Sequence, residues 1–291
     1  MTRPQHTPAF GSPIRPTIAL AWSALACLGA SAAQAAEEKP LWEAGMGVAV
    51  VSFPAYRGSD QTSQFVLPSP YFTYHGEFLK ADRHGVRGQL FDSDRVELTV
   101  SAALSPPATS DKIRARAGMP DLDANVEFGP RLDLVLWQTE GRARLLKLEL
   151  PLRAAYTLNS HSRSIGAVFH PKLNLDVTDV PGMPGWNLGL QAGPLYGDRR
   201  QHAYFYGVDA PYATADRPAY QARAGFAGMQ YLLALSKRYP RHWVGAFLRY
   251  DNLGGASFED SPLVRSKHYV AGGVAVSWIF GESSTRVPVD D

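Results

Sequence analysis

Cysteine is almost absent from this chain of 291 residues, which contains only Cys27. Residues 36–291 therefore have no thiol, and this excludes a disulfide framework or a cysteine-based zinc site there. A chain without thiols suits an oxidising export route. Because Leu25-Ala26-Cys27 resembles part of a lipobox, an alternative interpretation makes Cys27 a lipidated N-terminus.

Long apolar runs and helical stripes of apolar residues are missing after residue 36. This part of the chain therefore offers no candidate for a membrane-spanning helix. The apolar segment Thr17–Ala30 is short for such a helix, and Ala33-Gln34-Ala35 follows it as an A-x-A cleavage site. We predict that residues 1–35 are a signal peptide that is cleaved during export.

An excess of charge of either sign is also missing. The whole chain has 29 Lys and Arg against 27 Asp and Glu, and the leader removes Arg3 and Arg15, which leaves 27 of each. A neutral mature chain without a stripe of basic residues gives no indication of nucleic-acid binding. The chain also has no acidic tail long enough to suggest a disordered segment that binds a partner.

The sequence contains no convincing catalytic, metal or cofactor motif. The run Asn159-Ser160-His161-Ser162 has the residue types of a hydrolase, but these residues are also common at hairpin tips. The histidines lack the spacing of metal ligands; those considered are His84, His170, His202, His242 and His268. We therefore predict a protein that is not an enzyme and that uses no cofactor or metal.

What the sequence has is a two-residue period. Near its C-terminal end, small or apolar residues alternate with a second set; the first set is Val270, Gly272, Val274, Val276, Trp278 and Phe280, and the second is Tyr269, Ala271, Gly273, Ala275 and Ser277. Such alternation is typical of a strand with two different faces. Strands can cross a bilayer only in a closed barrel, which satisfies every backbone polar group. The fold class we predict is all-β, a closed antiparallel transmembrane barrel.

Eleven segments show this pattern, and they lie near 42–52, 65–75, 78–90, 94–103, 125–137, 143–156, 165–178, 185–195, 220–236, 242–251 and 268–280. Barrels of this type normally have an even number of strands, so we expect about 12, with 10 as the fallback. One strand is therefore either missing from this set or wrongly included in it, and the doubtful region is 65–124, where prolines interrupt the alternation. The predicted barrel occupies 36–280, and 281–291 form a C-terminal extension.

The order of these strands also predicts which connections share an end of the barrel. A periplasmic Phe280 places the long loops 157–164, 196–219 and 251–267 outside the cell. The short turns 138–142 and 238–241 then lie in the periplasm.

Charged residues occupy one face of several predicted strands, and the candidate lumen charges are Arg131, Asp133, Lys147, Glu149, Arg153, Lys172, Asp176, Arg223, Arg249 and Asp251. They could form ion pairs across a narrow lumen or line a path for solutes. Aromatic residues near the strand ends, among them Tyr71 and Trp243, suggest membrane interfaces, with core packing as the alternative.

The loop Tyr56, Arg57, Gly58, Ser59, Asp60 is a candidate partner or ligand surface. A tight turn in which the Asp60 side chain caps backbone amides explains the same residues.

Several short phrases, in this order and spacing, resemble the MltA-interacting protein (MipA/OmpV) family. They are Trp42 with Gly45 and Gly47, Pro54 to Asp60, Phe128-Gly129-Pro130, Tyr204 to Val208, Asp251-Asn252-Leu253, Gly255-Ala256, Asp260 to Val264, and Gly272-Gly273 to Phe280. The resemblance implies a barrel in the outer membrane of a Gram-negative bacterium, in contact with outer-membrane lipid and assembled by the barrel-insertion machinery. It also implies a non-enzymatic scaffold for a periplasmic lytic transglycosylase and a murein synthase. A pore for small solutes or antibiotics is the alternative. The chain departs from the family pattern by continuing past Phe280.

Overall fold

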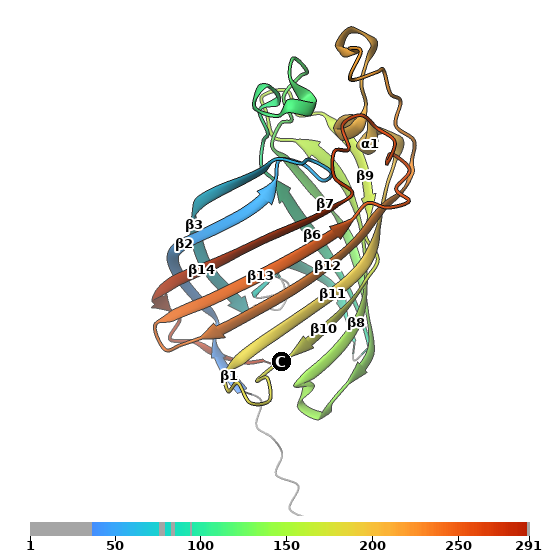
Figure 1. Ribbon diagram of the computed structural model, residues 1–291. Helices are drawn as coiled ribbons and strands as arrows, with labels where there is room; N and C mark the ends of the chain where they lie inside the picture. The colour runs from blue at the N-terminus through green and yellow to red at the C-terminus, as the bar shows by residue number, and fades with distance from the viewer. Residues whose placement is uncertain (1–36, 76–78, 83–84, 94, 290–291) are drawn as a thin grey trace, which may run out of the picture. The chain divides into compact units, whose positions relative to one another are not determined.

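The structure is a computed structural model that describes residues 37–75, 79–82, 85–93 and 95–289. The predicted signal peptide with Cys27, and also His84, lie outside these residues. Residues 37–291 form one compact unit, in which nearly all regular structure is antiparallel strand (Figure 1).

Thirteen strands form the main sheet. They are β2 (Trp42–Pro54), β3 (Thr62–His75), β4 (Leu79–Asp82), β5 (Gly85–Asp92), β6 (Val96–Ser105), β7 (Asn125–Gln138), β8 (Arg144–Thr157), β9 (Ser164–Phe169), β10 (Lys172–Val177), β11 (Trp186–Gly197), β12 (Gly225–Arg238), β13 (His242–Asn252) and β14 (His268–Glu282). Because β10 pairs with both β8 and β11, the sheet closes into a ring.

β9 and β10 are two halves of one strand. They are separated at His170 and Pro171, where the proline has no N–H to donate to a neighbouring strand. Counting these halves together gives a ring of twelve strands. The predicted closed antiparallel barrel of about 12 strands is therefore confirmed.

The strand that the sequence pattern missed lies within 78–90. This segment does not form one strand, because Asp82 pairs with Gly85 and the chain reverses between β4 and β5. The uncertain strand therefore lay in the doubtful region 65–124, and it was a strand missed, not one wrongly included.

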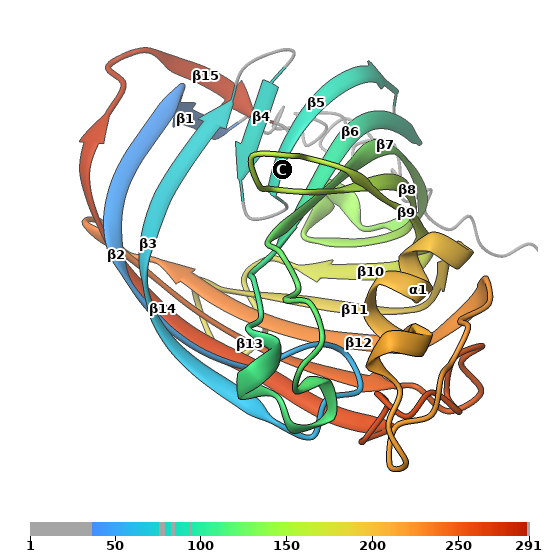
Figure 2. The same ribbon diagram turned by 90° about the horizontal axis from the view of Figure 1, so that it is seen from above.

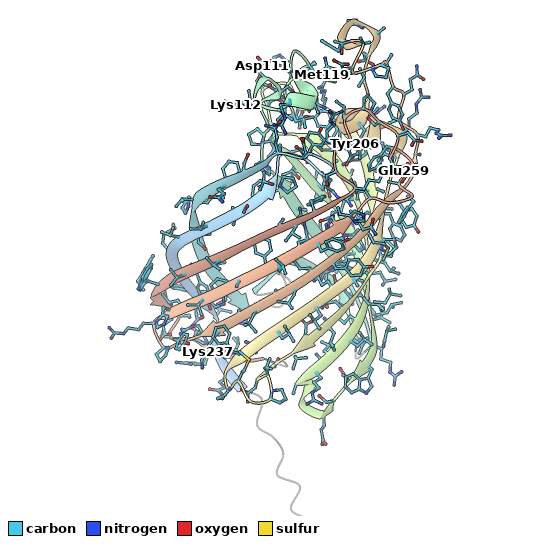
Figure 3. The ribbon with its side chains drawn as sticks, viewed as in Figure 1. Asp111, Lys112, Met119, Tyr206, Lys237 and Glu259 are labelled. Carbon is cyan, nitrogen blue, oxygen red and sulfur yellow. The ribbon has the colours of Figure 1, made fainter. Side chains whose placement is uncertain are left out.

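One end of the ring, which we call the loop end, carries the long connections. It holds the 3₁₀ turns η1 (Ser110–Lys112), η2 (Arg114–Arg116) and η4 (Ala210–Tyr212) and the helix α1 (Arg199–Tyr206). Asp111, Lys112, Met119, Tyr206 and Glu259 lie at this end, whereas Lys237 lies at the other (Figure 3). None of the helices in the described residues is long and apolar enough to cross a membrane.

The opposite end, the turn end, carries the short connections and one further 3₁₀ turn, η3 (Glu140–Arg142). Beyond the ring, β1 (Glu37–Pro40) pairs with β15 (Arg286–Val289) in a separate two-stranded sheet. The backbone bonds from Leu41 N to Thr285 O (2.9 Å) and from Ser283 N to Trp42 O (2.8 Å) continue the β14–β2 ladder into it. The predicted extension 281–291 thus contains the last residues of β14 and folds back onto the N-terminal part of the described chain.

The outer surface of the ring is apolar. Outward side chains such as Val66, Leu104, Val274 and Phe280 are 73%, 74%, 59% and 76% exposed. A soluble sandwich would bury this face, whereas a membrane barrel turns it towards lipid. The alternation seen in the sequence therefore has its apolar side outside.

Candidate functional site

The interior of the ring contains a cavity of about 410 Å³ with two unlike walls. Its polar wall comes from β7 to β11 and includes Arg131, Glu149, Arg153, Lys172 and Asp176. Its opposite wall comes from β2, β13 and β14 and consists mainly of small and apolar side chains; Ala49, Val51, Trp243, Phe247 and Ala275 belong to it. Trp243 and Tyr71 pack together inside, with ring centroids 6.2 Å apart, so the core-packing alternative applies to this pair of aromatic residues.

The inward charges of the polar wall contact one another. The shortest distances between charged or polar groups are 2.7 Å for Arg131–Asp133, 3.3 Å for Lys172–Glu149, 4.0 Å for Lys147–Glu97 and 2.7 Å for Asn174–Asp176. Arg153 Nε donates to Ser101 Oγ at 3.0 Å. Pairing offsets the cost of burying these charges, and each pair fixes the positions of its two side chains.

At the loop end, Asp251 is fully buried among cations. Its carboxylate lies 3.0 Å from Arg57 Nε and 2.9 Å from Arg249 Nε, and it accepts a 3.1 Å hydrogen bond from Gln230 Nε2. Arg57 Nε also donates to Tyr269 Oη at 3.2 Å. These residues come from three strands and one loop, so the group ties the loop end to the ring.

Arg223 is the one candidate lumen charge that the structure places elsewhere. β12 begins only at Gly225, so residue 223 precedes the sheet, and the strand alternation used to assign its side chain does not apply. The Arg223 side chain is exposed, and its backbone carbonyl accepts hydrogen bonds from the cap described next.

Above the ring, the loop-end segments pack into a cap with its own hydrophobic core. This core consists of Tyr56, Ile113, Leu122, Tyr206, Val208, Ala227, Leu253, Ala256, Phe258 and Leu263. Phe258 and Tyr206 stack with ring centroids 3.6 Å apart. Residues from five separate loops and strand ends therefore form one packed body.

Hydrogen bonds to backbone carbonyls hold this cap together. Tyr56 Oη donates to Leu263 O (2.6 Å), Tyr206 Oη to Arg57 O (3.0 Å) and Ser261 Oγ to Tyr206 O (2.7 Å). Burial raises the pKa of Tyr56 to about 12, so its hydroxyl stays protonated and remains a donor.

The candidate surface Tyr56 to Asp60 forms a turn within the cap. Tyr56 and Ser59 are buried, and Gly58 has φ of 95°, which a residue with a side chain rarely adopts. The Gly58 carbonyl accepts bonds from Arg265 N and Ser266 N. Asp60 contacts the exposed Arg114 at 2.9 Å. Most of this segment is thus engaged in intramolecular contacts.

His202 on α1 is a buried titratable side chain of the cap. Its side chain is 2% exposed, Nδ1 donates to Arg223 O at 2.6 Å, and its ring centroid lies 4.7 Å from that of Phe258. Burial lowers its pKa below the ordinary value of about 6.5, so the folded cap holds a neutral ring.

The opened cap should therefore bind a proton more readily than the closed one. The stability from neutral His202 is complete above about pH 6.5 and decreases as the pH falls towards the lower folded-state pKa. We expect amide protection factors for residues 199–206 to be smaller at pH 5 than at pH 7.5, and His202→Gln to remove the difference. His161→Gln, at an exposed hairpin tip, is the matched control; equal protection at both pH values in the unchanged protein would contradict the expectation.

The hydrolase-like run is a hairpin tip. Ser160 Oγ lies 3.0 Å from His161 Nδ1, and both residues are exposed. Within the described part of the chain, no carboxylate is recorded against the other nitrogen of this ring, as a catalytic triad would require. The described residues also contain no group of three or more His, Cys, Asp or Glu side chains that could hold a metal ion.

The sequence pattern did not single out a polar cluster near the turn end. Glu43 on β2 contacts Arg238 on β12 at 2.6 Å and accepts from Tyr71 Oη at 2.9 Å. Glu43 stands alone in an otherwise apolar segment. The sequence offered one signal for this cluster, an acidic residue among the inward-facing positions of an apolar strand. It gave no indication of the partner, because Arg238 lies 195 residues further along the chain.

The closed ring, its apolar outer surface and its charged interior define a transmembrane β-barrel of the outer-membrane type. The chain belongs to the MltA-interacting protein MipA family, whose family model matches residues 46–280. The suspected family is thereby confirmed.

Solved structures similar to this chain include two outer-membrane proteins. The COG4313 outer membrane channel from Pseudomonas putida F1 has 14% identity and a TM-score of 0.43, with 85% of this chain and 98% of that chain covered. Outer membrane phospholipase A from Escherichia coli has 13% identity and a TM-score of 0.35, with 83% and 91% covered. No curated protein sequence matches the chain.

Proposed function

We propose that this barrel is a non-enzymatic outer-membrane scaffold that holds a periplasmic lytic transglycosylase and a murein synthase near the membrane. The observation that carries the proposal is the packing of the loop end together with the paired charges of the interior. A packed cap lies at the loop end, and ion pairs lie on the lumen wall. Such contacts favour a rigid body over a wide channel. The family's description as MltA-interacting supports the choice of partner.

The turn end is the proposed partner surface and faces the periplasm in this proposal. It presents β1 and β15, which extend beyond the ring and join both ends of the described chain. Signal-peptide cleavage after residue 35 and insertion by the barrel machinery are part of the same proposal.

Affinity capture tests the scaffold. The purified barrel in nanodiscs should retain a periplasmic lytic transglycosylase more strongly than an unrelated barrel of similar size. A chain ending at Glu282, which lacks β15, should retain at least tenfold less of the enzyme. Replacing residues 111–119 of the cap by a Gly-Ser linker is the matched control and should leave capture unchanged. Retention no greater than that of the unrelated barrel would contradict the scaffold.

The lumen cavity favours a second candidate, a pore for small solutes or antibiotics. Its volume of about 410 Å³ lies in the range of small-molecule sites. Single-channel recording in planar bilayers separates the two candidates, because the scaffold should show no discrete conductance steps.

A further inference from the structure

Three arginines with unused hydrogen-bond donors lie in the loop-end part of the lumen, which we call the upper lumen. Arg153 on β8 donates through Nε to Ser101 Oγ, and its two Nη groups make no hydrogen bond or ion pair with any described residue. The Nη2 group of Arg57 is buried and has no partner among those residues either. Arg249 Nε lies 2.9 Å from Asp251 Oδ2, but without the geometry of a hydrogen bond. Because a guanidinium group has several N–H donors, most of the donors here are unused.

His170 points into the same space. The register between β8 and β10 continues through it, because Lys172 pairs with Glu149 and His170 N donates to Pro151 O. His170 therefore belongs to the inward row of Lys172, and Arg153 is its diagonal neighbour on β8. The side chain is only 9% exposed, and its Nε2 has no hydrogen-bond partner in the part of the chain that the structure describes. A buried polar atom without a partner costs free energy, which a ligand that bonds to it would recover.

The charges around the upper lumen do not balance. The three arginines and Lys172 are the charges that act on the His170 ring, and Lys172 is already paired with Glu149 at 3.3 Å. On the negative side, Asp251 is joined by Glu127 on β7, which interacts electrostatically with two of the arginines but forms no ion pair with a described residue. Three arginines against two carboxylates leave an excess of one positive charge.

The lumen cavity extends from this charged space towards the turn end. Arg153 lines it on one side, and Phe247 and Trp243 line it on another. Leu232, which pairs with Arg249, also belongs to its lining. Seen from above, β13 lies across the interior from β7 and β8 (Figure 2). A ligand in this cavity would hold a charged end among the arginines and an apolar body against the aromatic side chains.

We infer that the upper lumen binds a monovalent organic anion, a carboxylate with a small apolar body, whose charged end lies among Arg57, Arg153, Arg249 and His170. Guanidinium and carboxylate groups are both planar and can form two parallel hydrogen bonds. The single excess positive charge favours a monoanion over a phosphate dianion, which would leave a buried negative charge without a partner. The inference does not depend on the proposed scaffold function, since an internal ligand site neither requires nor prevents capture of an enzyme at the turn end.

Fluorine NMR of a small probe tests the site. The barrel in nanodiscs at pH 7.5 is titrated with 4-fluorophenylacetate, a monoanion with an apolar ring, and empty nanodiscs give the background. Two further probes keep the ring and change the charge of the head; 4-fluorophenylacetamide is neutral, and 4-fluorophenyl phosphate is a dianion. We expect the carboxylate to bind at least tenfold more tightly than either of them.

Three variants assign the binding to the upper lumen. Arg153→Gln should weaken binding of the carboxylate about tenfold and leave binding of the amide unchanged. Arg144→Gln, at the exposed turn-end start of the same strand, is the matched control and should change neither affinity. Glu127→Gln raises the excess positive charge from one to two, so the phosphate should gain at least tenfold in affinity relative to the carboxylate. A purely structural role of these residues would not change the preference between heads.

The inference is overturned if the carboxylate binds no more tightly than the amide or the phosphate, or if Arg153→Gln binds it as the unchanged protein does. Heat-modifiable gel migration verifies that each variant is folded. If Arg153→Gln does not fold, Arg153→Lys keeps the charge and loses the planar fork, and it should still weaken carboxylate binding several-fold. An unchanged preference between carboxylate and phosphate in Glu127→Gln would also contradict the site.

Discussion

Asp251→Asn should destabilise the junction between the cap and the ring by about 3–5 kcal/mol, because it removes the carboxylate from a buried charge group. Asp251 is fully buried and lies within 3.0 Å of Arg57 Nε and 2.9 Å of Arg249 Nε. Asparagine has nearly the same shape, so the change leaves packing intact and leaves two guanidinium groups facing each other without a counter-charge. The measurement is urea unfolding in detergent micelles, together with the rate of tryptic cleavage within 253–267.

Asp60→Asn is the matched control for this substitution. Its partner Arg114 is largely exposed, and a solvent-exposed ion pair contributes at most about 1 kcal/mol. Replacing Arg57, Arg249 and Asp251 together by apolar residues should cost less than Asp251→Asn alone, since no buried charge is then left unpaired. Equal effects of Asp251→Asn and Asp60→Asn would show that the buried group does not hold the cap.

Phe258→Ala should have an effect of similar size, a loss of about 3–5 kcal/mol, through an entirely different cause. The Phe258 ring is fully buried, stacks on Tyr206 at 3.6 Å and meets His202 edge-on at 4.7 Å. Alanine would leave a cavity in the centre of the cap. Hydrogen exchange should show faster opening of α1 and of 253–264, whereas the strands of the ring keep their protection.

Leu158→Ala provides the comparison for Phe258→Ala. Leu158 lies in another loop at the same end and is 53% exposed, so its loss should change stability by less than about 0.5 kcal/mol. Uniformly faster exchange of ring strands and cap after Phe258→Ala would mean that the cap does not open as a separate unit.

Part of the candidate site could be predicted from strand parity alone, that is, from the alternation of successive side chains between the two faces of a strand. Arg131, Asp133, Glu149 and Lys172 alternate with leucines, and the structure places all four inside. Arg223 was misplaced because parity applies only within a strand, and the glycine at which β12 begins cannot be located from the alternation. Parity also leaves open which charges meet, because partners on different strands depend on register.

The cap was not foreseeable in the same way. Its core combines loops that are separated by up to 207 residues, as in the Tyr56–Leu263 hydrogen bond, and irregular loops have no period that predicts which side chains face inward. Many of these residues occur in the short segments that resemble the MipA family. The sequence within each segment, however, gave no indication that Tyr56, Tyr206 and Phe258 pack together.

The sequence by itself determined that the chain forms strands with an apolar face and a charged face, because that period is a local property of successive residues. It also determined the membrane barrel, since strands with such faces can satisfy their backbone in lipid only by closing into a ring. Only the tertiary structure decided the ion-pair partners and the cap. Each of these depends on strand register or loop packing, which joins residues that the sequence keeps far apart.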